Sequence, residues 1–126
     1  MKTILEKIMS NLEDKTGATW NLYYSFGDGS PEISTYSPAG ENVLICLNGS
    51  TLAELANDAR EAREAFDPEE HAAQILVAKR SGTKEEKCFY AKAPNGLRDL
   101  LEDAEAIAGL YNALENELKA AAGVKS

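Results

Sequence analysis

The last quarter of the chain carries an apolar pattern that only a long helix can place on one face. From residue 97 the apolar side chains recur at alternating intervals of three and four residues, which is heptad spacing. They are Leu97, Leu100, Ala104, Ile107, Tyr111, Leu114 and Leu118. The pattern predicts a helix over residues 96–121, about 39 Å long at 1.5 Å per residue.

We call the helix face formed by these seven residues the seam, and the sequence allows two roles for it. The first helix and the sheet of the chain itself can cover it, as is usual for an apolar helix face. Alternatively, only its first half packs on a helix over residues 51–66, and its second half binds a second copy. The chain would then be a homo-oligomeric structural or regulatory module, a possible homodimer, assembled through residues 97–118. The contacts of that oligomer would be Ile107, Tyr111, Leu114 and Leu118.

The first part of the chain has the pattern of one helix and three strands. Apolar residues at helical spacing predict a helix over residues 1–16, which ends at Gly17. The segments "TWNLYYSF", "EISTYS" and "VLICL" are separated by "GDGSP" and "PAGEN", which are typical of turns. We therefore expect a three-stranded antiparallel meander over residues 19–47. The unbroken apolar run of "VLICL" favours a buried strand, with Cys46 as a small buried thiol.

Two further helices are expected between the sheet and the last helix. Thr51 and Glu54 form a capping box at the start of a helix that reaches residue 66. A second helix covers residues 68–80. Within residues 83–95, the segment "KCFYA" could form a fourth short strand or a packed loop. The expected fold is α+β in a single domain, 1–126: an N-terminal helix, a three-stranded antiparallel sheet and a three-helix C-terminal region. Residues 1–49 form the helix and β-meander, and residues 50–126 form the helical portion.

The segment "FDPEEH" contains the only histidine of the chain, His71, beside three carboxylates. A zinc site would need more nitrogen or sulfur ligands, and a general acid/base would need a nucleophile nearby. Local structure explains the segment better: Asp67 caps a helix that begins at Pro68, and Phe66 packs against His71. Whether His71 lines a concave pocket or only packs on Phe66 distinguishes the two interpretations. We expect no catalytic, cofactor-binding or metal residues, no cofactor and no enzyme activity.

Other candidate motifs are weak. Asp28 between two glycines predicts a turn and lacks the donors of a calcium loop. A basic cluster near Phe89 and Tyr90 fits a solvated helix end and loop better than a nucleic-acid contact. Its residues are Lys79, Arg80, Lys84, Lys87 and Lys92. Whether Cys46 and Cys88 lie near each other is open.

The charge of the chain limits its partners. The formal net charge is −8, and acids outnumber bases in both residues 1–50 and residues 51–126. Such a field repels nucleic acid and attracts a basic protein surface, although solubility alone also explains a negative surface. Spaced carboxylates on helices could imitate phosphates, or they could simply be solvated. The candidate partner-binding residues are Glu61, Glu64, Glu70, Asp99, Glu102, Asp103 and Glu105.

Aromatic residues gather in the predicted sheet. By strand alternation half of them should lie in the core and the rest could form an exposed patch, which would be an interface. They are Trp20, Tyr23, Tyr24, Phe26 and Tyr36. The chain shows neither a signal peptide nor an apolar run long enough for a membrane span, so we expect no membrane partner and a cytoplasmic location.

Residues 50–122 resemble a helical module of small phage and mobile-element proteins of gut Firmicutes. The resemblance is carried by "DAREA" followed by "FDPEEH", by the "AKRSG" helix end and by "LRDLLEDAEAI", and the chain departs from it in the longer connection "TKEEKCFYAKAPN". Members of this module supply no catalytic residue. The resemblance implies a phage or mobile-element origin, and small acidic proteins of that origin often resemble anti-CRISPR or anti-restriction inhibitors. Together with the charge, it predicts an acidic inhibitor that binds a basic surface of a host defence nuclease.

Overall fold

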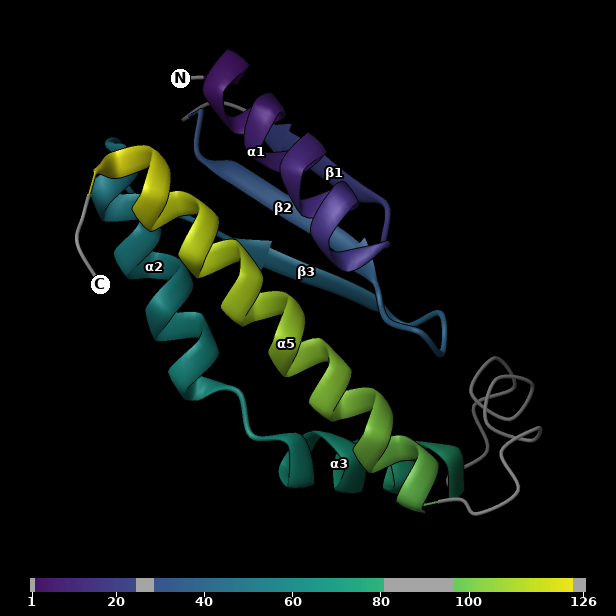
Figure 1. Cartoon of the computed structure of the whole chain (residues 1–126). Coiled ribbons are helices and arrows are strands. Elements are labelled where there is room, and N and C mark those ends of the chain that lie inside the picture. The colour runs from purple at the N-terminus through teal and green to yellow at the C-terminus, as the bar shows by residue number, and fades with distance from the viewer. Residues whose placement is uncertain (1, 25–28, 81–96, 124–126) are drawn as a thin grey trace.

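The fold is α+β, as the sequence predicts (Figure 1). A computed structural model of the chain describes residues 2–24, 29–80 and 97–123, without the side chains of residues 2, 76–80 and 97–99. An N-terminal helix precedes three strands, and three described helices follow them. The elements are α1 (Lys2–Thr16), β1 (Trp20–Tyr24), β2 (Pro31–Tyr36), β3 (Asn42–Cys46), α2 (Leu52–Ala65), α3 (Pro68–Arg80) and α5 (Leu97–Ala122).

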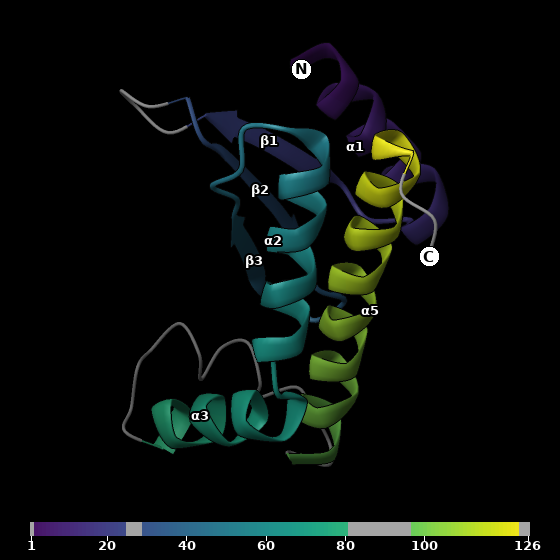
Figure 2. The same ribbon diagram turned by 90° about the vertical axis from the view of Figure 1, so that its left-hand side faces the viewer.

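The long helix α5 lies in the middle of the helical layer. The strands form an antiparallel sheet in the order β1-β2-β3. Figures 1 and 2 show α5 between α1 and α2, with α2 antiparallel to it, and α3 turned across the end at which α5 begins. Helix α5 therefore contacts each of the other described helices.

One face of the sheet belongs to the core. The pairing aligns Trp20 with Thr35 and Val43, and it aligns Leu22 with Ile33 and Ile45. Except for the partly buried Leu22, these side chains are buried, and the apolar ones form one cluster with apolar residues of α1, α2 and α5. The predicted meander is thus confirmed, with one face covered by helices.

The opposite face of the sheet is exposed and partly apolar. Tyr23, Tyr36 and Leu44 are each more than half exposed, and Cys46 is exposed as a free thiol. The prediction that Cys46 is buried was therefore wrong, and the predicted buried strand is buried on one face only. The pleat directs Val43 and Ile45 inward and Leu44 and Cys46 outward, although all four of these residues are apolar.

The seam of α5 is used by the chain's own core. Leu100 and Ala104 are buried, and so are Ile107, Leu114 and Leu118 in the half that we considered for an oligomer. Of the four residues considered for an oligomer, only Tyr111 is partly exposed. Because α1, α2 and the sheet already cover these side chains, they offer no surface to a second copy, and the first of the two uses applies.

Among the described residues, no helix combines the length and the apolar character that crossing a membrane requires.

Candidate functional site

The joint between α2 and α3 has the local structure that its sequence predicts. The Asp67 carboxylate accepts hydrogen bonds from the backbone N–H groups of Glu69 (3.0 Å) and Glu70 (3.4 Å), and so caps α3. The Phe66 and His71 rings lie with centroids 5.3 Å apart. The N-cap and the ring contact are both confirmed, and they explain why α3 turns away from α2 at this point.

His71 also has a partner that the local sequence does not show. Its Nε2 lies 3.0 Å from Oε2 of Glu41, in the connection between β2 and β3. That connection is a tight turn: the Glu41 N–H donates to Ser37 Oγ (3.0 Å), the Ser37 N–H donates to the Glu41 carbonyl (2.8 Å), and Gly40 has a φ of 86°. The histidine therefore joins the start of α3 to the end of the sheet.

His71 and Glu41 line a small pocket. The pocket has a volume of about 200 Å³, and its wall is made of Glu41, Asn42, Val43, Leu44, Phe66, His71, Ile107 and Tyr111. The Phe66 ring also lies 5.3 Å from the Tyr111 ring. Burial, with a smaller contribution from the Glu41 charge, raises the pKa of the Tyr111 hydroxyl. His71 thus both packs on Phe66 and lines a concave site, so the two interpretations of this segment are not exclusive.

Among the described residues, the pocket wall holds no serine, threonine or cysteine that a general base could activate. Within the described part of the chain, no group of three His, Cys, Asp or Glu side chains is arranged to hold a metal ion. The chemical groups that the pocket does offer are one carboxylate, one imidazole, one phenol and apolar surface.

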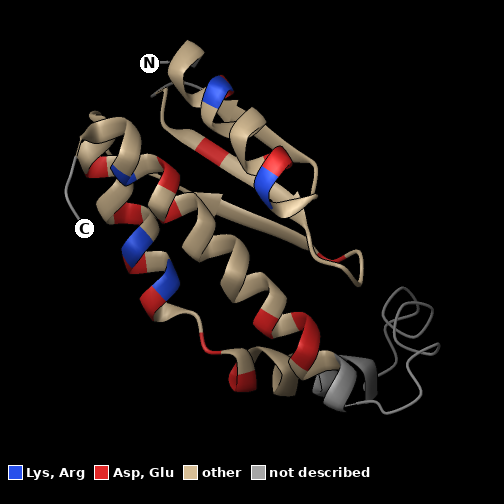
Figure 3. Cartoon of the chain, viewed as in Figure 1, with Lys and Arg blue, Asp and Glu red and all other residues tan. Residues whose placement is uncertain are grey.

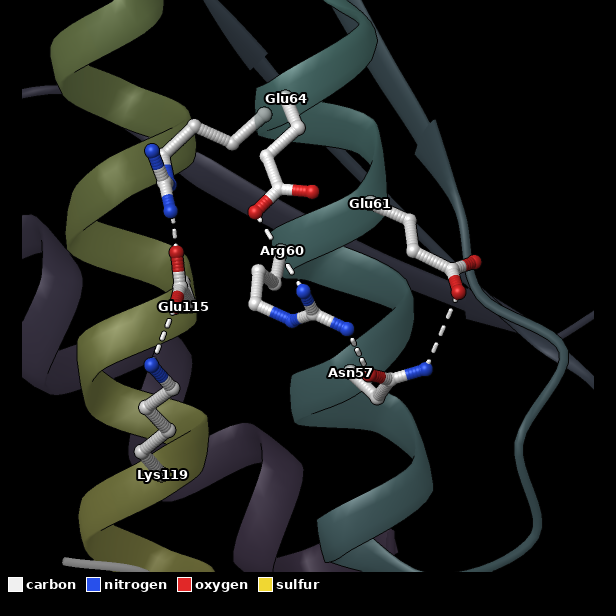
Figure 4. A network of polar contacts seen from close by, with 7 residues as sticks. Asn57, Arg60, Glu61, Glu64, Glu115 and Lys119 are labelled. Carbon is white, nitrogen blue, oxygen red and sulfur yellow. Dashed lines mark hydrogen bonds and ion pairs between the residues drawn. The ribbon is translucent and has the colours of Figure 1, made fainter. Parts of the chain in front are cut away.

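The candidate acids on α2 are exposed but engaged within their own helix. Arg60 contacts Glu64 (3.3 Å) and donates to the Asn57 side-chain oxygen (2.5 Å), and the Asn57 amide donates to Glu61 (3.2 Å) (Figure 4). Arg60 offsets part of the negative charge on this helix. The α2 face is therefore less attractive to a basic partner than its glutamates alone suggest.

The candidate acids of α3 and α5 fall into two groups. Glu70, Glu102 and Glu105 are exposed. Asp103 is 6% exposed and accepts a hydrogen bond from the Ala39 N–H (2.9 Å), so its assignment to a partner-binding face was wrong. Asp103 precedes Ala104 of the seam, and this position turns it under the β2–β3 connection. The side chain of Asp99 lies outside the described residues.

Acidic residues gather at the end of the molecule where α3 packs on α5. Glu69 and Glu70 begin α3, and Glu102 and Glu105 lie on the first half of α5, which packs on α3. We call these four residues the acidic end; Figure 3 shows acidic positions on both helices there. Glu69, Glu70 and Glu105 make no ion pair with any described residue.

Two buried glutamates of α5 were not identified from the sequence. Glu115 is 2% exposed and lies 2.5 Å from both Arg63 Nε and Lys119 Nζ (Figure 4), and Glu117 forms an ion pair with Lys15 of α1. Burial raises the pKa of Glu115, but the hydrogen bonds and charges of Lys119 and Arg63 outweigh burial and hold it below its ordinary value. These acids hold the helices together and are not available to a partner.

Acidification should therefore destabilise the chain partly through Glu115. Its lowered pKa means that the ionised form stabilises the fold above the ordinary carboxyl range, and that this contribution is lost as the pH falls through the folded-state value. We expect the urea midpoint to fall between about pH 7 and about pH 3, and to fall less in Glu115→Gln. Equal falls in both proteins would show that the Glu115 ion pairs do not contribute.

Several sequence predictions concern residues outside the described ranges. These are Phe26, Asp28, Cys88 and the basic cluster at residues 79–92, of which only the backbone of residues 79 and 80 is described.

A comparison of the chain with protein-family models, with curated proteins and with solved structures found no match.

Proposed function

We propose that this chain is a non-enzymatic acidic protein that binds a basic surface of a bacterial defence enzyme that handles nucleic acid, and so inhibits it. The observation that supports this most is the acidic end, where Glu69, Glu70 and Glu105 are exposed on two packed helices and make no ion pair with any described residue. The net charge of −8 adds a long-range attraction to any basic groove.

The acidic residues lie on helices that are fixed in place, and this favours recognition of a protein over simple hydration of the charges. Helix α3 is fixed to the rest of the fold by Ala72, which packs with Leu100 in a small buried cluster, and by the His71–Glu41 contact. Carboxylates on fixed helices lose less conformational entropy on binding than carboxylates on loose loops. A groove whose lysine and arginine side chains bind phosphates would bind these carboxylates in place of nucleic acid.

The proposed target class rests on the resemblance to phage and mobile-element proteins together with the charge. A protein of that origin that blocks a CRISPR or restriction nuclease would act in the cytoplasm of a bacterial host. In this proposal the α2 glutamates lie outside the main contact, because Arg60 and Arg63 lie among them.

A matched pair of variants tests the proposal. One variant removes three charges at the acidic end (Glu69→Gln, Glu70→Gln, Glu105→Gln), and the other removes three exposed charges elsewhere (Glu6→Gln, Glu61→Gln, Glu64→Gln). Binding to a panel of purified restriction and CRISPR nucleases is measured by surface plasmon resonance at about 0.05 M and about 0.5 M salt. We expect the first variant to bind its target roughly tenfold more weakly than the second.

Equal weakening in both variants would assign binding to net charge alone and remove the specific role of the acidic end. No binding to any member of the panel at low salt would contradict the proposed target class.

A further inference from the structure

The pocket beside His71 combines a negative charge with aromatic and aliphatic walls. We propose that it binds an alkylammonium group, which is either the head of a small organic amine or the side chain of a lysine. Glu41 supplies the charge, the rings of Phe66, His71 and Tyr111 supply π surfaces, and aliphatic side chains complete the wall.

The carboxylate of Glu41 is placed to receive a cation. One of its oxygens, Oε2, contacts His71 Nε2 at 3.0 Å, which fixes the side chain and leaves Oε1 for a ligand. The Glu41 side chain is 21% exposed, so it is partly desolvated but remains accessible from solvent. A partly desolvated charge attracts an opposite charge more strongly than one fully in water.

The aromatic rings suit the same ligand. Phe66 lies between His71 and Tyr111, with both ring centroids 5.3 Å from its own. The His71 and Tyr111 rings are tilted by 52° and 33° to the Phe66 ring. The faces of aromatic rings attract cations, and methylated ammonium groups are commonly bound among several such rings. Val43 and Ile107 provide apolar contacts for the methyl or methylene groups that an alkylammonium carries.

The wall composition argues against other ligand classes. A hard metal ion needs several oxygen ligands, and the described wall of the pocket has one carboxylate. An anion would meet Glu41 without a lysine or arginine among the described wall residues to balance it. This inference does not depend on the proposed function, although a lysine of a basic partner is one of the two sources of the ligand.

The test compares ligands that differ in charge and not in shape. The chain labelled with nitrogen-15 is titrated with choline and with its neutral isostere 3,3-dimethyl-1-butanol, and amide shifts are followed by NMR. We expect choline to shift residues of the pocket wall and to bind roughly tenfold more tightly than the isostere. Acetyl-lysine-methylamide, with and without side-chain trimethylation, distinguishes a lysine source from a small-molecule source.

Variants then assign the preference to the pocket. Glu41→Gln keeps an acceptor for His71 and should reduce choline affinity roughly tenfold, while Glu61→Gln should not change it. Tyr111→Leu should weaken choline more than the isostere. Equal affinity of the wild-type chain for choline and its isostere, or no shift in the pocket wall up to about 50 mM of every ammonium ligand, overturns the proposal, and neither result requires a variant to fold.

Discussion

Replacement of Leu114 by alanine is expected to lower the free energy of unfolding by about 3 kcal/mol. Leu114 is fully buried on α5, in the cluster that joins α1, α2 and the inner face of the sheet. The substitution removes three carbon atoms from a place enclosed by rigid elements, so the cavity cannot collapse and its cost adds to the lost burial. The measurement is urea unfolding followed by circular dichroism.

Leu44→Ala is the matched control, because it removes the same atoms from a side chain that is 51% exposed on the outer face of the sheet. We expect its effect to stay within about 1 kcal/mol. Similar losses in the two variants would mean that the outer face is covered in solution. A loss below about 1 kcal/mol for Leu114→Ala would contradict the burial of the seam.

Replacement of Gly49 by alanine should destabilise the chain by about 2 kcal/mol, although only a methyl group is added. An added Cβ would lie 2.5 Å from Glu54 Cβ, 2.8 Å from Glu54 C and 2.9 Å from Leu55 N, and none of these atoms can move without moving α2. The loop cannot easily shift either, because the Asp58 carboxylate accepts hydrogen bonds from the N–H groups of Asn48 (3.0 Å) and Gly49 (2.7 Å).

Gly109→Ala is the control of opposite sign. Gly109 is exposed within α5, and an added Cβ there would meet nothing within 4 Å. Alanine in place of a helical glycine should stabilise the chain by roughly 0.5–1 kcal/mol. The comparison is read from thermal and urea unfolding of both variants. A neutral Gly49→Ala would show that the β3–α2 loop is not held against α2.

The helices and strands of this fold could be predicted from local sequence patterns, because residues close in the sequence specify each helix and strand. The seam of α5 fixes a helix by its spacing, and Asp67 with Pro68 fixes the start of α3. The error in β3 has the same origin. In an unbroken apolar run, periodicity cannot separate a strand buried on both faces from one exposed on one face, and only the pairing and the helices decide that Leu44 points outward.

The site could be predicted only in part, because its parts come from distant segments. His71 and its packing on Phe66 follow from adjacent residues, whereas Glu41 lies 30 residues earlier and reaches His71 only through the turn after β2. The buried acids Asp103, Glu115 and Glu117 each adjoin a seam residue of α5. Glu105 also adjoins a seam residue, Ala104, and is exposed, so a position beside the seam does not by itself identify a buried acid. The burial and the partners are decided only when the helices are placed.

The central claim is that the acidic end occupies a nucleic-acid groove of its target, and competition with DNA tests it most directly. A nuclease that binds the chain is incubated with fluorescent duplex DNA, without its catalytic metal, and the anisotropy is followed as the chain is added. We expect the wild-type chain and the control variant Glu6→Gln, Glu61→Gln, Glu64→Gln to displace the DNA. We expect the variant Glu69→Gln, Glu70→Gln, Glu105→Gln to displace it only at roughly tenfold higher concentration. DNA that stays bound while the chain saturates the enzyme, or equal displacement by both variants, would contradict the claim.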